Sequence, residues 1–173
     1  MHHPTLKRAT IKDASIIALL GRVTFTETFG HLFPDKNELL AYYDRTFSVE
    51  KIEESLKKKT NVYWLAYIDR LPVAYAKLKL DSSSNFLNSA ATCQLQKIYV
   101  LRDFLSQRVG VSLQNELLNC ALNSGYHNIW LSVLQSNERA MSFYQNTGFN
   151  KVGTHEFQIG TQNFHFNVMS RDL

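Results

Sequence analysis

The spacing of apolar positions divides the first third of the chain into a short strand and three helices. After Asp13, apolar residues recur every three or four positions, which is the period of a helix with one buried face. This stripe consists of Ile16, Leu19, Leu20 and Val23. Asp13 is the expected N-cap of the helix, and Glu27 continues its stripe. The predicted elements are a strand over residues 6–10 and helices over 13–28, 37–47 and 48–58.

The rest of the chain alternates between strand and helix patterns. Aromatic and β-branched residues over 62–68 and 73–80 flank the turn sequence Asp69-Arg70-Leu71-Pro72, which predicts a hairpin followed by a polar loop over 81–90. The further predicted elements are strands over 91–100, 128–133, 149–152 and 164–170, and helices over 110–124 and 137–146. This order indicates an α/β (α+β) fold, a mixed sheet with helices on its faces, in one domain over residues 1–173.

Composition narrows the class of protein. With 45% hydrophobic and 20% charged residues among 173, the chain is neither a disordered tail, a collagen-like rod nor a disulfide-rich miniprotein. The two cysteines, Cys93 and Cys120, match no metal spacing and fit a reducing compartment. We see no secretory signal and no apolar run near the ~20 residues of a membrane span, so we expect a cytoplasmic protein without membrane partners. The net charge of +4 favours an anionic ligand, or nucleic acid.

The segment between the strand that ends near Val100 and the helix that begins near Gly110 has features of an anion site. The first N–H groups of a helix lack intrahelical partners, and the helix dipole adds partial positive charge there. Gly110 lets the backbone approach a ligand closely, Ser112 is small, and Arg108 adds a positive charge. The sequence has neither a Walker ending nor the three-glycine dinucleotide fingerprint. An ordinary strand-to-helix turn has the same local pattern.

A second motif narrows the class of protein further. The pattern Asn-x-x-Ala-x-x-Phe-Tyr-x-x-x-Gly-Phe runs from Asn137 to Phe149, and Gln-x-x-Gly-x-Ser runs from Gln107 to Ser112. In this order and at this separation, the motifs resemble those of the GNAT superfamily of N-acetyltransferases, which use acetyl-coenzyme A. The resemblance covers nearly the whole chain. The segment from Glu27-Thr28-Phe29-Gly30 through the strand with Trp64 also resembles the bacterial spermidine/spermine N-acetyltransferase subfamily.

The resemblance implies a fold and a set of roles. It implies a mostly antiparallel central sheet with helices on both faces, in which the strand with Ile98, Tyr99 and Val100 splays from its neighbour at 128–133. The main chain of these three residues would line the pantetheine arm of acetyl-CoA, and Asn137 would bond the cofactor near the same arm. The residues implied to hold the pyrophosphate are Gln107, Arg108, Val109, Gly110, Val111 and Ser112. Tyr144 would point its hydroxyl at the thioester sulfur, although a plain core tyrosine also fits its apolar stripe.

Two positions depart from the family pattern. Relatives often carry a glutamate base on the cofactor strand, where this chain has Gln94 and Gln96, and an amide is no useful base near neutral pH. Glu27 is our substitute candidate, the alternative being a helix-end residue that reaches solvent. Ser112 replaces a more usual glycine or alanine. The histidines, including His155, show no metal-ligand spacing and are expected to be structural or at the surface, so we predict no metal site.

The sequence therefore predicts transfer of an acetyl group from acetyl-CoA to a primary amine of a small molecule. The subfamily resemblance suggests a polyamine, for which Glu27, Asp35, Glu38 and Asp44 would supply acidic groups. An amino acid, an aminoglycoside or a protein N-terminus are alternative acceptors. A non-catalytic acyl-CoA-binding module is the alternative function, and a nucleic-acid binder rests on the pI of about 9.1 alone. A homodimer is left open.

Overall fold

The computed structural model describes residues 3–173. The strands are β1 (Thr5–Arg8), β2 (Asn61–Ile68), β3 (Leu71–Lys79), β4 (Thr92–Val100), β5 (Asn128–Leu134), β6 (Asn150–Ile159) and β7 (Gln162–Asp172). The helices are α1 (Ala14–Phe29), α2 (Lys36–Thr46), α3 (Val49–Lys57), α4 (Val109–Asn123) and α5 (Glu138–Asn146). Short 3-10 turns cover Ile11–Asp13, Gly30–Leu32 and Arg102–Phe104. The element order agrees with the prediction.

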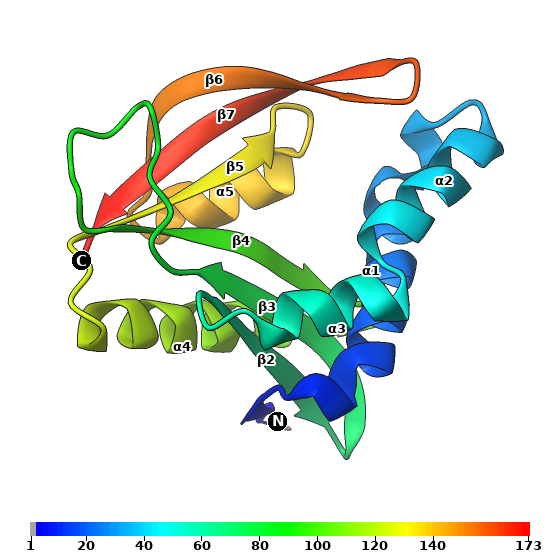
Figure 1. The fold of residues 1–173 in the computed structure, drawn as a ribbon, viewed down its shortest axis with the longest axis horizontal. Coiled ribbons are helices and arrows are strands. Elements are labelled where there is room, and N and C mark those ends of the chain that lie inside the picture. The colour runs from blue at the N-terminus through cyan, green and yellow to red at the C-terminus, as the bar shows by residue number, and fades with distance from the viewer. Residues whose placement is uncertain (1–2) are drawn as a thin grey trace.

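The strands form one seven-stranded sheet in the order β1-β2-β3-β4-β5-β7-β6 (Figure 1). The neighbours are antiparallel except β4 and β5, which run parallel. Because a parallel connection needs a crossover, α4 lies between β4 and β5 in the sequence. The predicted mixed, mostly antiparallel sheet is thus confirmed.

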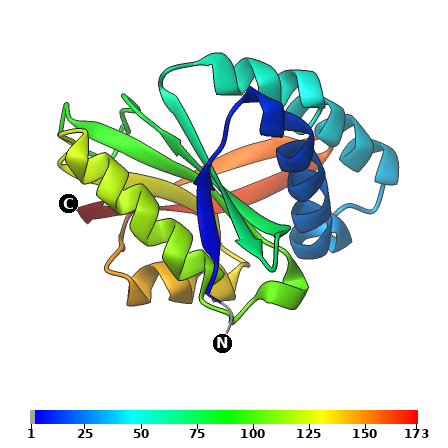
Figure 2. The same ribbon diagram turned by 90° about the horizontal axis from the view of Figure 1, so that it is seen from below.

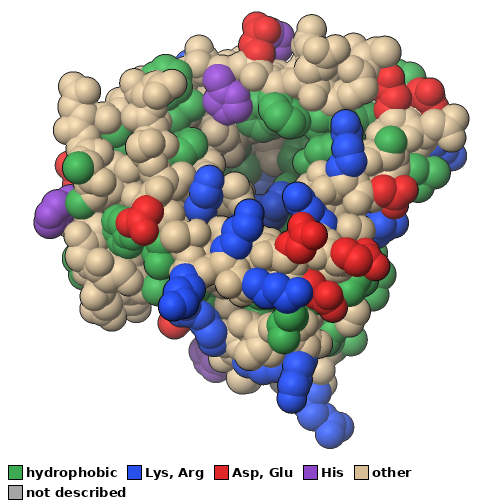
Figure 3. Space-filling view, viewed as in Figure 1, with side chains coloured by type: hydrophobic (Ala, Val, Ile, Leu, Met, Phe, Trp, Pro, Cys, Tyr) green, Lys and Arg blue, Asp and Glu red, His purple; other side chains and the backbone are tan. Residues whose placement is uncertain are grey.

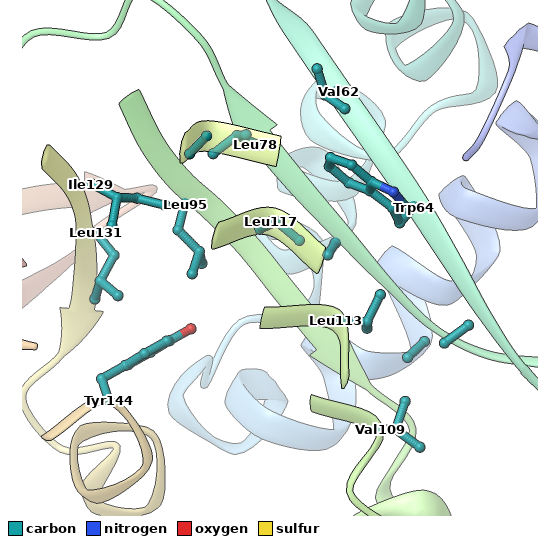
Figure 4. Close-up of a cluster of buried hydrophobic side chains, with 14 of the residues drawn as sticks. Val62, Trp64, Leu78, Leu95, Val109, Leu113, Leu117, Ile129, Leu131 and Tyr144 are labelled. Atoms are coloured by element: carbon teal, nitrogen blue, oxygen red, sulfur yellow. The ribbon is translucent and has the colours of Figure 1, made fainter. Parts of the chain in front are cut away.

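Helices cover both faces of this sheet (Figure 2). On one face, Leu113 and Leu117 of α4 and Tyr144 of α5 pack with strand residues in the largest hydrophobic cluster (Figure 4). On the other face, α1 and α3 pack on β2 and β3 through a second cluster that includes Ile17. A third, aromatic cluster joins α1, α2 and the β6–β7 hairpin through Phe25, Phe47 and Ile159, among others. The aromatic residues of this third cluster therefore lie together between α1, α2 and the β6–β7 hairpin.

The start of α1 differs from the prediction in two ways. Asp13 stands at the predicted N-cap position of α1, but its side chain makes no capping hydrogen bond to the helix. It is buried, ends the 3-10 turn, and accepts hydrogen bonds from Thr10 N (2.8 Å) and Lys7 Nζ (2.9 Å). The expected stripe is also rotated, since Leu19 is 63% exposed. A Cβ on Gly21 would lie 2.4 Å from a ring carbon of Phe47, so this glycine lets α1 approach the Phe47 ring. Small residues therefore form part of the buried face, and apolar spacing alone misses them.

The C-terminal hairpin is much longer than the strands predicted over 149–152 and 164–170. β6 and β7 pair from Asn150↔Ser170 to Ile159↔Gln162. Most of β6 is exposed, so its sequence lacks the alternation of a half-buried strand. The hairpin extends past the end of β5 toward α2 (Figure 1).

Candidate active site

The parallel strands β4 and β5 pair for only part of their length. The ladder contains Thr92↔Asn128, Cys93↔Ile129 and Gln94↔Trp130 and then stops. Beyond Gln94, β4 is still paired with β3, and beyond Trp130, β5 is still paired with β7. The facing edges of β4 and β5 therefore carry backbone N–H and C=O groups without a strand partner, and such groups need partners when they are removed from water. The predicted splay is confirmed.

A β-bulge in β4 lies at the point where the two strands part. Leu95 pairs with Leu78 and Lys97 pairs with Lys77, so Gln96 is an extra residue without an opposite partner. A bulge bends its strand and re-aims the residues that follow it. The bend therefore accompanies the separation of β4 from β5, and it turns Lys97 to the face opposite Leu95.

A cavity of about 830 Å³ occupies this separation and continues toward α1 and α2. Its walls come from α1, β4, the start of α4, β5, α5 and the β6–β7 hairpin. Figure 3 shows a hollow with apolar walls on this face, next to a group of Lys and Arg side chains. Among the described residues of the cavity wall, Glu27 is the one carboxylate, whereas four are cationic: Lys97, Arg102, Arg108 and Arg139. The cavity therefore suits an anionic or neutral ligand.

The N-terminus of α4 opens into the cavity without a cap. Arg108 has a left-handed backbone (φ 61°), no side chain caps the helix, and its first turn contains no acidic residue. Arg108, Val109, Gly110 and Val111 line the cavity. The amides that a cap would satisfy are thus available to an anion.

The two ends of the predicted pyrophosphate segment lie outside the cavity wall. Gln107 Nε2 donates to Asp103 O (3.3 Å), and both N and Oγ of Ser112 donate to Arg108 O. Their side chains therefore stabilise the loop and the first turn of α4.

The three β4 residues expected along the pantetheine arm, Ile98, Tyr99 and Val100, all line the cavity. The Tyr99 ring packs edge-on against Tyr75 at 5.6 Å, and burial raises the pKa of its hydroxyl. Its side chain is therefore held in the aromatic core.

Tyr144 and Asn137 enter the cavity wall from opposite ends of α5. Tyr144 is 8% exposed, packs edge-on against Phe149 at 5.6 Å, and extends toward Leu95 and Leu131 (Figure 4). Burial raises the pKa of its hydroxyl. Asn137 caps α5 by accepting from Ala140 N at 3.1 Å, which fixes its amide oxygen and leaves its Nδ2 donor for other partners.

Glu27 is held by the turn that follows β4. Its Oε2 accepts a hydrogen bond from Arg102 N (2.9 Å), and the Arg102 guanidinium donates to the backbone oxygen of Glu27. One carboxylate oxygen is thus engaged while the side chain lines the cavity. The other three acids named for a polyamine have structural partners: Asp35 caps α2, Glu38 accepts from Thr161 N, and Asp44 pairs with Arg22.

Sequence reasoning missed two polar side chains of the cavity wall. His155 lines the cavity, lies 2.8 Å from Ser132 Oγ through Nε2, and stacks on Phe166. The strand β6 was not predicted beyond residue 152, so no feature of the sequence placed His155 next to the site. Lys97 also lines the cavity, and only the bulge at Gln96 places it there.

Within residues 3–173, no helix has the length and apolar character to cross a membrane. In the same range, no cluster of three or more His, Cys, Asp or Glu side chains has the arrangement of a metal site.

These features define a class of enzyme. The uncapped α4 amides fit a diphosphate, and the unpaired edges of β4 and β5 fit the amides of a pantetheine arm. Both ligand groups belong to coenzyme A. The cavity joins this region to an apolar chamber next to Tyr144. The class is an acyltransferase with a coenzyme A thioester as co-substrate.

Comparison with known proteins agrees. Residues 25–149 match the Acetyltransferase (GNAT) family. An uncharacterized N-acetyltransferase of Mycobacterium tuberculosis is 28% identical over 135 residues, which cover 78% of this chain and 82% of that protein. Another from Lactobacillus delbrueckii is 22% identical and covers 86% of each chain.

Solved structures show the same fold. The PaiA N-acetyltransferase of Thermoplasma acidophilum, in complex with coenzyme A, superposes with a TM-score of 0.79 at 16% identity, covering 99% of both chains. A GCN5-related N-acetyltransferase of Rhodopseudomonas palustris also gives 0.79, at 17% identity, covering 100% of this chain and 98% of that one. The chain belongs to the GNAT family and is an acetyl-CoA-dependent N-acetyltransferase.

Proposed function

We propose that this chain transfers the acetyl group of acetyl-CoA to a primary amine of a small acceptor by direct attack on the thioester. One observation carries the proposal: the uncapped start of α4, the separated strands and the Tyr144 side chain all line one continuous cavity. Acetyl-CoA supplies the activated carbonyl. The chain supplies binding, orientation and proton transfer.

We assign the binding roles to backbone groups. The free amides of Val109, Gly110 and Val111, with the Arg108 charge, favour a diphosphate at this end of the cavity. The β4 backbone at Ile98 to Val100 and the Nδ2 of Asn137 provide hydrogen-bonding groups for an extended arm. We infer that Gln107 and Ser112 support this loop from outside the cavity.

We assign to Tyr144 a hydrogen bond to the leaving sulfur. Its hydroxyl keeps its proton well above neutral pH, because burial raises the pKa. An ordinary tyrosine is already a weaker acid than a thiol by about 1.5 pKa units, or roughly 2 kcal/mol. Tyr144 therefore acts first as a donor that stabilises the thiolate.

The amine must lose a proton before it attacks. At pH 7 an ordinary primary amine of pKa about 10.4 is almost all protonated, and exposing its lone pair costs roughly 4.6 kcal/mol. Glu27 is our candidate acceptor for this proton, because it is the one carboxylate among the described residues of the wall. The imidazole of His155, in the same wall, is the competing candidate.

Replacing Glu27 by Gln tests this assignment. We expect kcat/KM at pH 7 to fall about 100-fold, the usual contribution of a general base, with a changed acid limb of the pH profile. Asp44→Asn is the matched control, since Asp44 is exposed on α2 and pairs with Arg22. A profile that is unchanged in Glu27→Gln but changed in His155→Asn would transfer the role to His155.

The acceptor class is narrowed by the charges of the wall. The sequence suggested a polyamine, which needs several carboxylates, but Asp35, Glu38 and Asp44 are engaged in helix, hairpin and ion-pair contacts. The cavity therefore offers a polyamine little more than Glu27. We propose a small amine as acceptor and treat spermidine as one member of the panel that tests it.

The decisive experiment is thiol release from acetyl-CoA with a panel of amino acids, polyamines and aminoglycosides, alongside calorimetric binding of coenzyme A. We expect binding, and thiol release above background with at least one amine. Binding without release from any amine would favour the non-catalytic acyl-CoA-binding module instead. Absence of coenzyme A binding would contradict both.

We also retain three expectations as proposals: one domain over residues 1–173, a cytoplasmic location and a homodimer. A buried, unpaired thiol at Cys93 supports a reducing compartment. Size-exclusion chromatography with light scattering measures the oligomeric state directly.

A further inference from the structure

Two lysines face each other across β3 and β4 at the end of the sheet near the aromatic cluster. Lys77 and Lys97 are register partners directly after the bulge, so their side chains share one face of the sheet. Lys97 Nζ lies 5.0 Å from the ring centre of Phe47 and 5.1 Å from that of Tyr99. Lys77 Nζ lies 5.3 Å from the ring centre of Tyr63. Both ammonium groups are therefore partly withdrawn from water among aromatic rings.

Neither lysine has a carboxylate partner among the described residues, since no ion pair within 4 Å involves either Nζ. The charges near Lys77 are instead of the same sign, from Lys97, Lys79, Lys58 and Lys51. Burial lowers the pKa of Lys97 to about 8, and burial with repulsion from Lys97 lowers the pKa of Lys77 to about 7. A partly buried cation without a counter-ion is unfavourable, so its environment favours an incoming anion.

Lys97 is the member of this pair that lines the cavity. The chamber around it is aromatic, with Phe25 and Phe29 of α1 at 4.9 Å between ring centres, and Phe33 and Phe164 at 5.5 Å. The other cations of the wall lie elsewhere: Arg102 bonds Glu27, Arg108 lies at the start of α4, and Arg139 lies at the start of α5 and donates to Ser106 Oγ. The acceptor end thus combines an apolar chamber with one unpaired ammonium group.

We infer that Lys97 binds a carboxylate of the acceptor, so that the acceptor is an α-amino acid with an apolar or aromatic side chain. This inference rests on the proposed function and deepens it. The acceptor's side chain occupies the aromatic chamber, its carboxylate pairs with Lys97, and its amine attacks the thioester. The nitrogen then forms the amide bond, the carbon–sulfur bond breaks, and coenzyme A leaves as a thiolate that accepts a hydrogen bond from Tyr144, while the amine proton passes to the general base. In an α-amino acid the carboxylate and the amine are attached to the same carbon. This short separation fits a site in which the Lys97 ammonium and the thioester share one cavity.

A matched set of acceptors tests the inference in the wild-type enzyme. L-phenylalanine, phenylalaninamide and phenethylamine share one ring and one amine but differ in the carboxylate. We expect kcat/KM to be about tenfold or more higher for phenylalanine than for the other two, the usual gain from a hydrogen bond to a charged group. A higher kcat/KM for phenethylamine or spermidine than for phenylalanine would overturn the inference and leave the acetyltransferase proposal intact.

Variants of Lys97 test whether this residue causes the preference for phenylalanine. Lys97→Met keeps the length of the side chain and removes its charge, so we expect the preference for phenylalanine to disappear, mainly through a higher KM. Lys97→Arg should retain at least part of the preference. Lys79→Met is the control, because Lys79 lies on the same strand as Lys77 but outside the cavity wall. An equal loss for phenylalanine and phenethylamine in Lys97→Met would show that Lys97 serves the structure and does not bind the carboxylate.

These experiments distinguish failure of the carboxylate inference from failure of the acetyltransferase proposal. Thiol release with none of the amines contradicts the acetyltransferase proposal together with this inference. If the Lys97 variants do not fold, the comparison of acceptors in the wild-type enzyme still decides the matter.

Discussion

Tyr144 belongs both to the hydrophobic core and to the wall of the cavity. Its ring packs against Phe143 and Phe149, while its hydroxyl reaches the strands that part. The resemblance of the motif from Asn137 to Phe149 to the GNAT pattern implied a role for this residue from the sequence. The apolar stripe also fitted a core tyrosine, but the sequence could not show that the same side chain lies at the cavity wall, since that depends on elements far away in the sequence.

Replacing Tyr144 by Phe keeps the ring and removes the donor. We expect kcat to fall about 100-fold and the affinity for coenzyme A to change little. Steady-state kinetics and calorimetry measure the two quantities. Tyr126→Phe is the control, because that hydroxyl bonds Asp81 at 2.7 Å and lies outside the cavity wall. Wild-type turnover in Tyr144→Phe would remove Tyr144 from the mechanism.

Lys97 shows what residue patterns miss. Within a regular strand, Lys97 would share a face with Leu95, and the bulge at Gln96 reverses that relation. Over so short a segment, the alternation of apolar and polar residues does not reveal a single extra residue. The sequence therefore predicted the strand and not the cation that it contributes to the cavity.

At the scale of elements, the start of α4 combines a backbone requirement with a charge requirement. A Cβ on Gly110 would be in ordinary contact, 3.9 Å from the Phe143 ring and 4.0 Å from Val100. We therefore expect Gly110→Ala to fold and to bind coenzyme A with little loss. Gly110→Asp adds a negative charge beside the proposed diphosphate and should weaken binding by about tenfold or more. Equal affinities for the two variants, measured by calorimetry, would show that the anion binds elsewhere.

The β6–β7 hairpin is attached to α2 at its tip. Glu38 Oε1 accepts a hydrogen bond from Thr161 N at 2.9 Å, and a Cβ on Gly160 would lie 2.4 Å from the Glu38 carboxylate carbon. Ile159 and Phe164 of the hairpin line the chamber. The hairpin thus forms one wall of the acceptor end, and its attachment fixes the width of that end.

Replacing Glu38 by Ala removes the attachment. We expect the KM of the acceptor to rise by about fivefold, because the wall loses its fixed position, with little change in the KM of acetyl-CoA. Hydrogen exchange at residues 159–162 should become faster. Glu54→Ala on α3 is the control. Unchanged exchange and an unchanged acceptor KM would mean that packing alone holds the hairpin.

Buried elements were easier to predict from the sequence than exposed elements. The β2–β3 hairpin was predictable because a compact polar turn separates two apolar segments, and Asp69 and Arg70 do adopt left-handed backbone there. The predicted extent of β6 was wrong because the strand is mostly exposed, and its pairing with β7 has little counterpart in its own sequence.

At the scale of the whole molecule, the free energy of unfolding should depend on pH in two opposite ways. Burial lowers the pKa of Lys77 to about 7 and of Lys97 to about 8, whereas unfolded lysines titrate near 10.5. Between pH 7 and 9 the unfolded chain therefore binds more protons, and stability rises with pH. Burial raises the pKa of Cys93 to about 12 from 9.0, and also raises that of Tyr99 and Tyr144. These groups oppose the lysines above pH 9, and because unfolded lysines keep their protons until about pH 10.5, the trend reverses near pH 10.

Urea unfolding at pH 7, 8, 9 and 10 measures this dependence. We expect a maximum between pH 9 and 10, and a smaller rise from pH 7 in the double variant Lys77→Met, Lys97→Met. Lys79→Met is the control. A curve that falls steadily from pH 7, or a double variant with the wild-type curve, would contradict the assignment.

Gln96 also limits how stable this molecule can become. Deleting it would leave every later β4 side chain on its present face while straightening the strand, because the residue has no opposite partner on β3. A straight β4 could pair with β5 along its whole length and form the backbone hydrogen bonds that are now missing. The resulting protein would be more stable, but it would lack the opening between β4 and β5 that we propose for the coenzyme A arm.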